Sequence, residues 1–300
     1  MSAPWLDRDF VGYGRTPPDP QWPGGARLAL NLVLNYEEGS EPSIPDGDAA
    51  TESGLTEGGT PGPGRDLAAE SMFEYGSRVG FWRLMRILNE RQAPATIFGC
   101  AVALDRNPEA VAAIREAGMD VCCHGRRWVN HQGLSVEQER AEIADAVNIL
   151  RRLFGQAPLG WYCRYGPSLH TRQLLVEHGG FLYDSDAYND ELPYWKRVGD
   201  QPHLVVPYTL TNNDAKFARG NFATADDFFA YMRDAVDMLL REGAEQPKMM
   251  SIGMHLRLMG HPGRAAGLER FLDDLARRSG VWLCHRADLA RHWATTHPAP

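Results

Sequence analysis

Two adjacent carboxylates stand at the end of a long apolar segment. Residues 28–36 form this segment, and Glu37, Glu38 and Gly39 follow it. A buried strand has no internal use for two neighbouring carboxylates. At a strand end, where a cleft can open, they can do acid–base chemistry or hold a cation. The alternative is a solvated strand end before a glycine turn.

Other apolar segments also end on reactive side chains. Because the loops after parallel strands of a barrel open on one face, these side chains are expected to share that face. Taken singly, each has a structural explanation, such as a hydrogen-bonded histidine or a salt bridge at the rim. Together they predict an active site, and they are Glu37, Glu38, His124, Arg164, Asp184, Asp186, His255 and Arg257.

The pattern of the chain predicts the elements that would position these groups. Short, continuous apolar runs are typical of parallel strands buried on both faces, and here they alternate with helical patterns, as in an α/β barrel. The predicted strands are 28–36, 95–101, 119–123, 160–163, 181–183, 203–208, 249–255 and 281–284. The predicted helices are 72–89, 108–117, 135–154, 224–241, 268–278 and 287–293.

Composition bounds the organisation of the chain and its partners. Residues 1–25, rich in Pro, Gly and aromatics, predict an extended arm, and 26–300 a single domain whose long loop at 40–66 lies above the active face. The net charge of −8 argues against nucleic acid or an anionic membrane as partner. No apolar run reaches the ~20 residues of a membrane span, and the start lacks a signal-peptide pattern. We therefore expect a cytoplasmic enzyme of a small-molecule substrate.

The arm also bears on assembly. It carries the aromatic residues Trp5, Phe10, Tyr13 and Trp22 without a core of its own. Such segments commonly bury their aromatics against a neighbouring subunit, so we expect a homo-oligomer, a tetramer or a dimer.

The motifs resemble those of the polysaccharide deacetylase superfamily. Members form a deformed (β/α)7 barrel and hydrolyse amide bonds, usually with a metal. The resemblance implies that Glu37 is the general base, Glu38 a metal ligand and His255 the acid. It matches His124 to the first histidine of a His-x-x-x-His motif, and Arg164 to the arginine of an Arg-and-Pro motif.

Two departures from this pattern concern the metal. The carboxylates are Glu in place of Asp, and Trp128 stands where the second metal-binding histidine belongs. Indole has a donor N–H and no lone pair for a cation. His131 lies seven residues after His124, which in a helix is about 10 Å, too far for one ion to bind both. We expect no cofactor, with a divalent metal such as zinc at Glu38, His124 and His131 as the open alternative.

The departures themselves resemble one branch of the superfamily. That branch includes metal-independent bacterial allantoinases and cyclic imide hydrolases, and the resemblance covers nearly the whole chain. The segments that carry it are 35–39, 74–78, 124–128, 179–186, 192–195 and 255–258. The match is weaker at 163–170, a loop that should touch substrate.

Amide hydrolysis needs a base for water, a stabiliser for the oxyanion and an acid for the leaving nitrogen. We expect Glu37 to activate water, assisted by Glu38, and His255 to protonate nitrogen. Because the two carboxylates repel, one pKa should rise. Arg164 and His124 would orient the carboxylate or the substrate carbonyl. Candidates to bind a flat polar ring are Trp128, Trp161, Tyr188, Asn213, Asp214 and Arg257.

Three functions remain open at this point. A hydrolase of small cyclic amides, ureides or imides is favoured, because such rings have good leaving groups and need a Lewis acid least. A metal-dependent N-deacetylase of a sugar is the alternative, and a barrel that binds without catalysis is the third.

Overall fold

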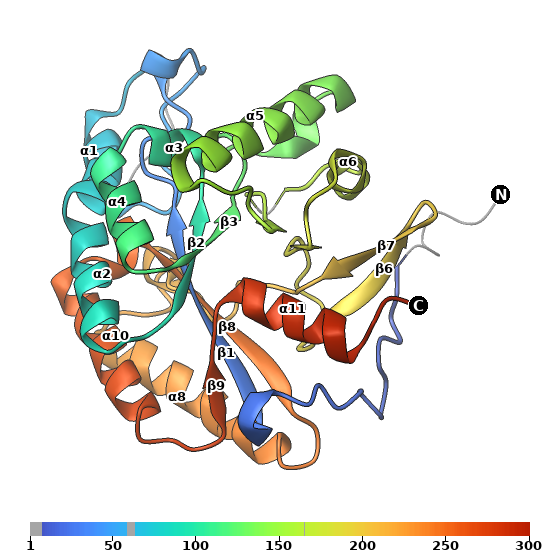
Figure 1. Ribbon diagram of the computed structural model, residues 1–300. Helices are drawn as coiled ribbons and strands as arrows, with labels where there is room; N and C mark the ends of the chain where they lie inside the picture. Colours follow the sequence, from blue (N-terminus) through green and yellow to red (C-terminus); the bar gives the residue numbers. More distant parts are fainter. Residues whose placement is uncertain (1–7, 59–63, 165) are drawn as a thin grey trace.

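A curled sheet of nine strands forms the centre of the computed structural model, which describes residues 8–58, 64–164 and 166–300 (Figure 1). The strand order is β6-β7-β5-β4-β3-β2-β1-β8, and β9 also pairs with β1. Every pair is parallel except β6 and β7, which form an antiparallel hairpin. The strands are β1 (Leu28–Tyr36), β2 (Ala95–Gly99), β3 (Asp120–Cys123), β4 (Gly160–Trp161), β5 (Tyr183–Asp184), β6 (Tyr194–Val198), β7 (Gln201–Val205), β8 (Lys248–His255) and β9 (Val281–Leu283).

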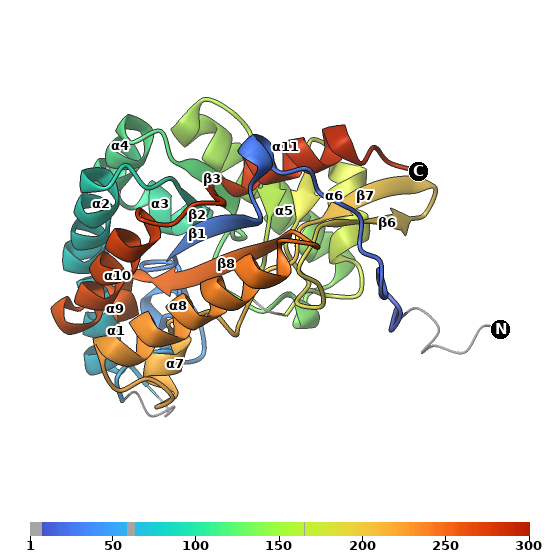
Figure 2. The same cartoon turned by 90° about the horizontal axis from the view of Figure 1, so that it is seen from below.

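Helices surround the outside of the sheet (Figures 1 and 2). Together with the strand order, they make the fold a deformed TIM-like barrel, so the fold class predicted from the sequence is confirmed. The helices are α1 (Leu67–Tyr75), α2 (Phe81–Glu90), α3 (Ala101–Asp105), α4 (Pro108–Glu116), α5 (Val136–Phe154), α6 (Thr171–His178), α7 (Ala215–Ala218), α8 (Ala225–Glu242), α9 (Leu256–Met259), α10 (Pro262–Leu275) and α11 (Arg286–Thr296). Among the described residues, no helix is long and apolar enough to cross a membrane.

Strand β1 is the central strand of the site. All nine of its residues are buried, because β2 and β8 pair with it on its two edges and helices cover the sheet. The register places Asn35 beside His255 of β8 and Phe98 of β2. The pairing therefore brings the carboxylates that follow β1 next to the end of β8, more than 200 residues away in the chain.

Local capping signals fix the two longest helices. Ser135 and Gln138 form a reciprocal capping box at the start of α5, and Gly155 ends that helix in the left-handed conformation, with φ of 76°. Thr224 and Asp227 form a second capping box at the start of α8. Both helix starts were predicted from the sequence and are confirmed.

The predicted helix at 72–89 is interrupted by a π-helical turn, η4 (Gly76–Gly80). Glycine is required at both ends of this turn. A Cβ at Gly76 would lie 2.6 Å from Oε1 of Glu38, and a Cβ at Gly80 would collide with the backbone carbonyl of Leu256. The irregular turn thus lets α1 and α2 approach the carboxylates and α9.

Strand β6 was missed. Its residues are half-buried or exposed, so it lacks the continuous apolar run that marked the other strands. Its partner β7 covers 201–205, whereas the sequence predicted 203–208. An antiparallel edge hairpin depends on its turn and on tertiary packing, which an apolar-run criterion does not detect.

The described part of the N-terminal arm packs against the barrel of its own chain (Figure 2). Trp22 is buried against Trp282, with ring centroids 5.8 Å apart, and its indole nitrogen donates to the carbonyl of Lys248. The hydroxyl of Tyr13 donates to the carbonyl of Pro193, while Phe10 is 77% exposed. Trp5 lies outside the described residues. The homo-oligomer and the single domain at 26–300 stay predictions.

A buried arginine spans the open side of the barrel. The side chain of Arg286 is fully buried at the start of α11, and it has no carboxylate partner among the described residues. It donates instead to the hydroxyls of Ser251 in β8 and Ser185 after β5, and to the carbonyl of Val206 after β7. Arg286 therefore joins β8 to β5 and β7, strands that do not pair with β8.

We expect Arg286→Ala to lower the free energy of unfolding by about 3–5 kcal/mol, because the hydroxyls and carbonyls around it would lose a charged donor without access to water. Urea denaturation followed by circular dichroism measures the change. Arg277→Ala is the control, since that side chain is 70% exposed, and should change stability by less than about 0.5 kcal/mol. Equal effects of the two substitutions would contradict the bridging role.

Candidate active site

Three side chains from three strand ends meet at one carboxylate oxygen. Glu37 follows β1, His124 follows β3 and His255 ends β8. Oε1 of Glu37 lies 3.3 Å from Nε2 of His124 and 3.6 Å from Nε2 of His255. All three residues are at most 6% exposed. The site therefore offers a carboxylate and two imidazoles on one side of the barrel.

His255 is held from behind by a second carboxylate. Oδ1 of Asp214 accepts the Nδ1 proton of His255 at 2.6 Å, and Oδ2 accepts the backbone N–H groups of His255 and Met259. Asp214 is fully buried and precedes α7. These contacts fix the ring so that Nε2 faces Glu37.

The environment of His124 fixes where its proton lies. Nδ1 faces the backbone carbonyl of Tyr162 at 2.9 Å, and a carbonyl can only accept, so Nδ1 carries hydrogen. Nε2 faces Glu37, which is also an acceptor when ionised. Nε2 of His124 is therefore directed at Oε1 of Glu37, at 3.3 Å.

The other oxygen of Glu37 faces a buried arginine. Nη1 of Arg257 lies 2.8 Å from Oε2 of Glu37 and 3.0 Å from Oε1 of Glu38. Glu38 also accepts the backbone N–H of Arg257, and Nε of Arg257 donates to the carbonyl of Leu55. One guanidinium thus forms ion pairs with both carboxylates that follow β1.

The two carboxylates consequently differ in protonation. Burial raises the pKa of Glu37, but Arg257, His255 and His124 outweigh burial and hold the pKa below its usual value. Burial raises the pKa of Glu38 above its usual value, with Arg257 opposing and the like charge of Glu37 adding to the rise. The pKa that rises belongs to Glu38, which does not line the pocket, and Glu37 stays ionised near neutral pH.

The pKa of His255 is raised. Burial lowers it, but the charges of Glu37 and Asp214 outweigh burial. The side chain that faces the pocket is therefore more readily protonated than an ordinary histidine, as a proton donor requires.

These groups line a narrow pocket. Its volume is about 30 Å³, room for a single water molecule, so a substrate ring requires lining residues to move. Arg164 lines it, paired with Glu52 at 2.5 Å and stacked over Trp128 at 3.8 Å. The lining residues are Asn35, Glu37, Leu55, His124, Trp128, Tyr162, Arg164, Tyr208, Leu210, Asn213, Ala215, Arg219 and His255.

Several residues predicted to bind substrate lie elsewhere. Trp161 is fully buried in the core, edge-on to Phe181, and does not line the pocket. Tyr188 is 43% exposed, and its hydroxyl is hydrogen-bonded to that of Tyr162. Asp214 and Arg257 face His255 and the glutamates. Trp128 and Asn213 do line the pocket.

Arg164 and Arg257 lie on different sides of the site. Arg164 was expected to orient the carboxylate or the substrate carbonyl, and it lines the pocket while pairing with Glu52 of the long loop after β1. Arg257 was expected to contact substrate, but it pairs with Glu37 and Glu38. Sequence position could not distinguish them, because both directly follow strands.

Some lining residues were not predicted. Asn35 is a polar residue inside the apolar run of β1, a signal that could have been used. Its amide donates to the hydroxyl of Tyr208, which follows β7. Leu55 comes from the long loop, whose position only the fold reveals.

The residues proposed for a metal do not form a ligand set. Glu38 is paired with Arg257, and His131 is bound to Glu139 at 3.0 Å. Trp128 presents an indole face to two guanidinium groups. Over the described ranges, no three His, Cys, Asp or Glu side chains are grouped to hold an ion. The donor set therefore does not fit the metal that the superfamily usually carries.

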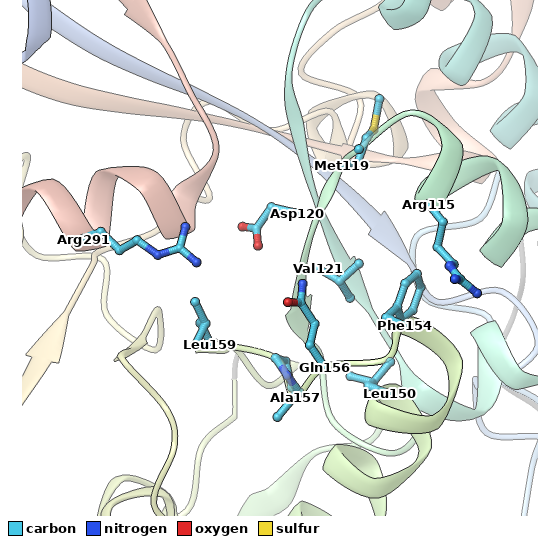
Figure 3. Close-up of a pocket in the computed structure, with 12 residues that line it drawn as sticks. Arg115, Met119, Asp120, Val121, Leu150, Phe154, Gln156, Ala157, Leu159 and Arg291 are labelled. Atoms are coloured by element: carbon cyan, nitrogen blue, oxygen red, sulfur yellow. The ribbon is translucent and has the colours of Figure 1, made fainter.

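A larger cavity, of about 290 Å³, lies where β3 begins (Figure 3). Asp120, Gln156 and Arg291 extend into it from different elements. None of the residues predicted for the site lines this cavity, and it lacks a paired base and acid. The narrow pocket is therefore the candidate active site, although it is the smaller of the two.

Comparisons with known proteins identify the family of the chain. A family model for polysaccharide deacetylase matches residues 63–181, which include His124 and Arg164 but neither Glu37 nor His255. A Schizosaccharomyces pombe protein, named provisionally as a polysaccharide deacetylase, is 40% identical over 97% of this chain and 98% of its own length. The chain belongs to the polysaccharide deacetylase family. This membership makes the protein a hydrolase of carbon–nitrogen amide bonds.

Two solved structures cover nearly the whole chain. The crystal structure of Puue allantoinase is 47% identical, with a TM-score of 0.95, over 99% of each chain. A probable polysaccharide deacetylase from Pseudomonas aeruginosa is 48% identical, with a TM-score of 0.93, over 97% of this chain and 99% of that one. A Helicobacter pylori peptidoglycan deacetylase is 33% identical over 47% of this chain and 48% of its own length.

We expect Asp214→Asn to lower the pKa of His255, because the amide removes one of the two negative charges that raise it. Titration of the imidazole followed by NMR measures both proteins, and the unaltered protein should titrate above the usual value of about 6.5. The exposed His170 in the same spectra is the internal control and should not shift. An unchanged His255 titration would contradict the assigned role of Asp214.

Proposed function

We propose that the protein hydrolyses the C–N bond of a small cyclic amide, ureide or imide, with allantoin as the leading candidate. One observation carries the proposal. A carboxylate held ionised and a histidine held ready for protonation face the same narrow pocket, 3.6 Å apart. The 47% identity to an allantoinase over nearly the whole chain supports the same substrate class.

In the proposed reaction, Glu37 takes a proton from water while the water oxygen bonds to the ring carbonyl carbon. His255 gives its Nε2 proton to the ring nitrogen as the C–N bond breaks. The products are a carboxylic acid, which ionises, and a free N–H group. The proton on Glu37 returns to His255 across their short separation, which restores the starting state.

The electrostatics favour an activated substrate. A lowered pKa keeps Glu37 ionised but makes it a weaker base. Arg164 is the candidate to polarise the carbonyl, because it lines the pocket and a guanidinium offers several N–H donors. Ureides and imides have electrophilic carbonyls and good leaving groups, so they demand less of this base than an acetamide does.

The alternative function is metal-dependent N-deacetylation of a sugar. The names of several relatives favour it, but the donor set does not fit a metal. A non-catalytic barrel is opposed by the intact pairing of Glu37 and His255.

Turnover assays on three substrates separate these functions. We expect hydrolysis of allantoin or succinimide, and not of an N-acetylglucosamine oligomer, with activity unchanged after dialysis against chelator. Product carboxylate and released amine are measured directly, and metal content by elemental analysis. Deacetylation of the oligomer that is lost on chelation would establish the alternative, and no turnover of any substrate would favour the non-catalytic barrel.

Paired substitutions test the assigned base and acid. Glu37→Gln should lower kcat by about 10² to 10⁴ with little change in KM, and His255→Ala should cost a similar factor. The double variant should lose much less than the product of the two, because the groups act in one step. His178→Ala, at an exposed position of α6, is the control.

Substrates that differ in leaving group locate the role of His255. A good leaving group needs less protonation of its nitrogen. His255→Ala should therefore lower kcat less for a substrate with a good leaving group than for one with a poor leaving group. Equal sensitivity of good and poor leaving groups would move His255 from proton donation to orientation or oxyanion binding.

A further inference from the structure

Two buried carboxylates that are adjacent in sequence need a positive charge. Glu37 and Glu38 are 1% and 3% exposed, and burying either one ionised and alone would be very costly. Metal-dependent sites meet this demand with an ion. In this protein the demand is met by Nη1 of Arg257, which lies within 3.0 Å of both carboxylates.

The surroundings of Arg257 are those of a cation site. Its guanidinium carbon lies 4.3 Å from the ring centre of Phe73 and 4.9 Å from that of Trp128. Aromatic faces attract cations, and Arg packs on them better than any other cationic side chain. The carbonyl of Leu55 accepts from Nε. The side chain is 1% exposed and does not line the pocket.

The arginine contacts two of the positions where a metal ligand was expected. It binds Glu38, and it lies over Trp128, the residue in place of the second metal-binding histidine. Indole cannot donate a lone pair to a metal, but its face suits a guanidinium. The change to tryptophan and the presence of Arg257 are therefore parts of one arrangement.

We propose that Arg257 is the resident cation of this site and occupies the place of the divalent metal. It holds Glu37 ionised and oriented, with Oε1 directed at His255 and the pocket. It is a positioning residue, since it does not touch the pocket. The inference rests on the proposed hydrolysis for its kinetic test and on the cation site alone for its binding test.

Arg257→Ala and Arg257→Lys test the proposal in the full-length protein. Arg278→Ala is the matched control, because Arg278 also bridges two carboxylates, Asp237 and Asp274, away from the pocket. In Arg257→Ala, kcat should fall about 100-fold or more with KM nearly unchanged. Millimolar guanidinium should restore activity about tenfold and saturably, and should leave Arg278→Ala unaffected. Arg257→Lys, which keeps the charge, should retain more activity than Arg257→Ala.

Binding gives a second test that needs no substrate. Titration calorimetry with guanidinium should show about one equivalent bound to Arg257→Ala and none to the unaltered protein, because the substitution vacates the place of a guanidinium group between Glu37 and Glu38. Guanidinium should also raise the Tm of Arg257→Ala and not that of Arg278→Ala. If the unaltered protein turns over no cyclic amide, the proposed function fails while this test still decides the role of Arg257.

Three results would overturn the proposal. One is a raised KM with unchanged kcat in Arg257→Lys, which would make Arg257 a substrate-binding residue. Another is a folded Arg257→Ala that neither binds guanidinium nor regains activity with it. The third is zinc binding by the unaltered protein with Arg257 in place. Where Arg257→Ala does not fold, the ratio of kcat to KM effects in Arg257→Lys decides the matter.

Discussion

The burial of two adjacent carboxylates at the end of β1 is the constraint on which the rest of the site depends. Each carboxylate would cost several kcal/mol unless paired and hydrogen-bonded. Arg257 supplies the charge, but a buried guanidinium has needs of its own. Phe73 and Trp128 cover its faces and the carbonyl of Leu55 accepts one of its protons. Gly76 leaves the room that the Glu38 side chain occupies. Five parts of the chain thus contribute to one ion cluster.

Within this cluster, the two carboxylate oxygens of Glu37 have different neighbours. Oε2 faces a permanent cation, and Oε1 faces two histidines and the pocket. The permanent cation keeps the carboxylate ionised and weakens it as a base. The pKa of His255, by contrast, is raised, because the charges of Glu37 and Asp214 outweigh the effect of burial. The charges around one carboxylate thus set the pKa of both Glu37 and His255.

Much of the fold could be predicted because parallel strands buried on both faces leave a strong local signal. β1 matches its predicted bounds, and the capping boxes at Ser135 and Thr224 fixed two helix starts. β6 gave no such signal, since half its surface faces solvent. The turn η4 was hidden inside an apparently continuous helical pattern, and its glycines have meaning only beside Glu38 and Leu256.

The sequence by itself determined which reactive side chains follow strands, and hence that Glu37, His124, Arg164 and His255 lie at one end of the barrel. It also determined that position 128 offers no lone pair. Only the tertiary structure decided the pairings: Arg257 with the two glutamates, Arg164 with Glu52, Asp214 with His255, and Trp161 with the core. The physical reason is that the pattern of apolar residues along a strand fixes which residue follows the strand. The partner of a buried charge is instead the opposite charge that the fold brings within about 3 Å of it. That distance depends on elements up to 219 residues apart in the chain.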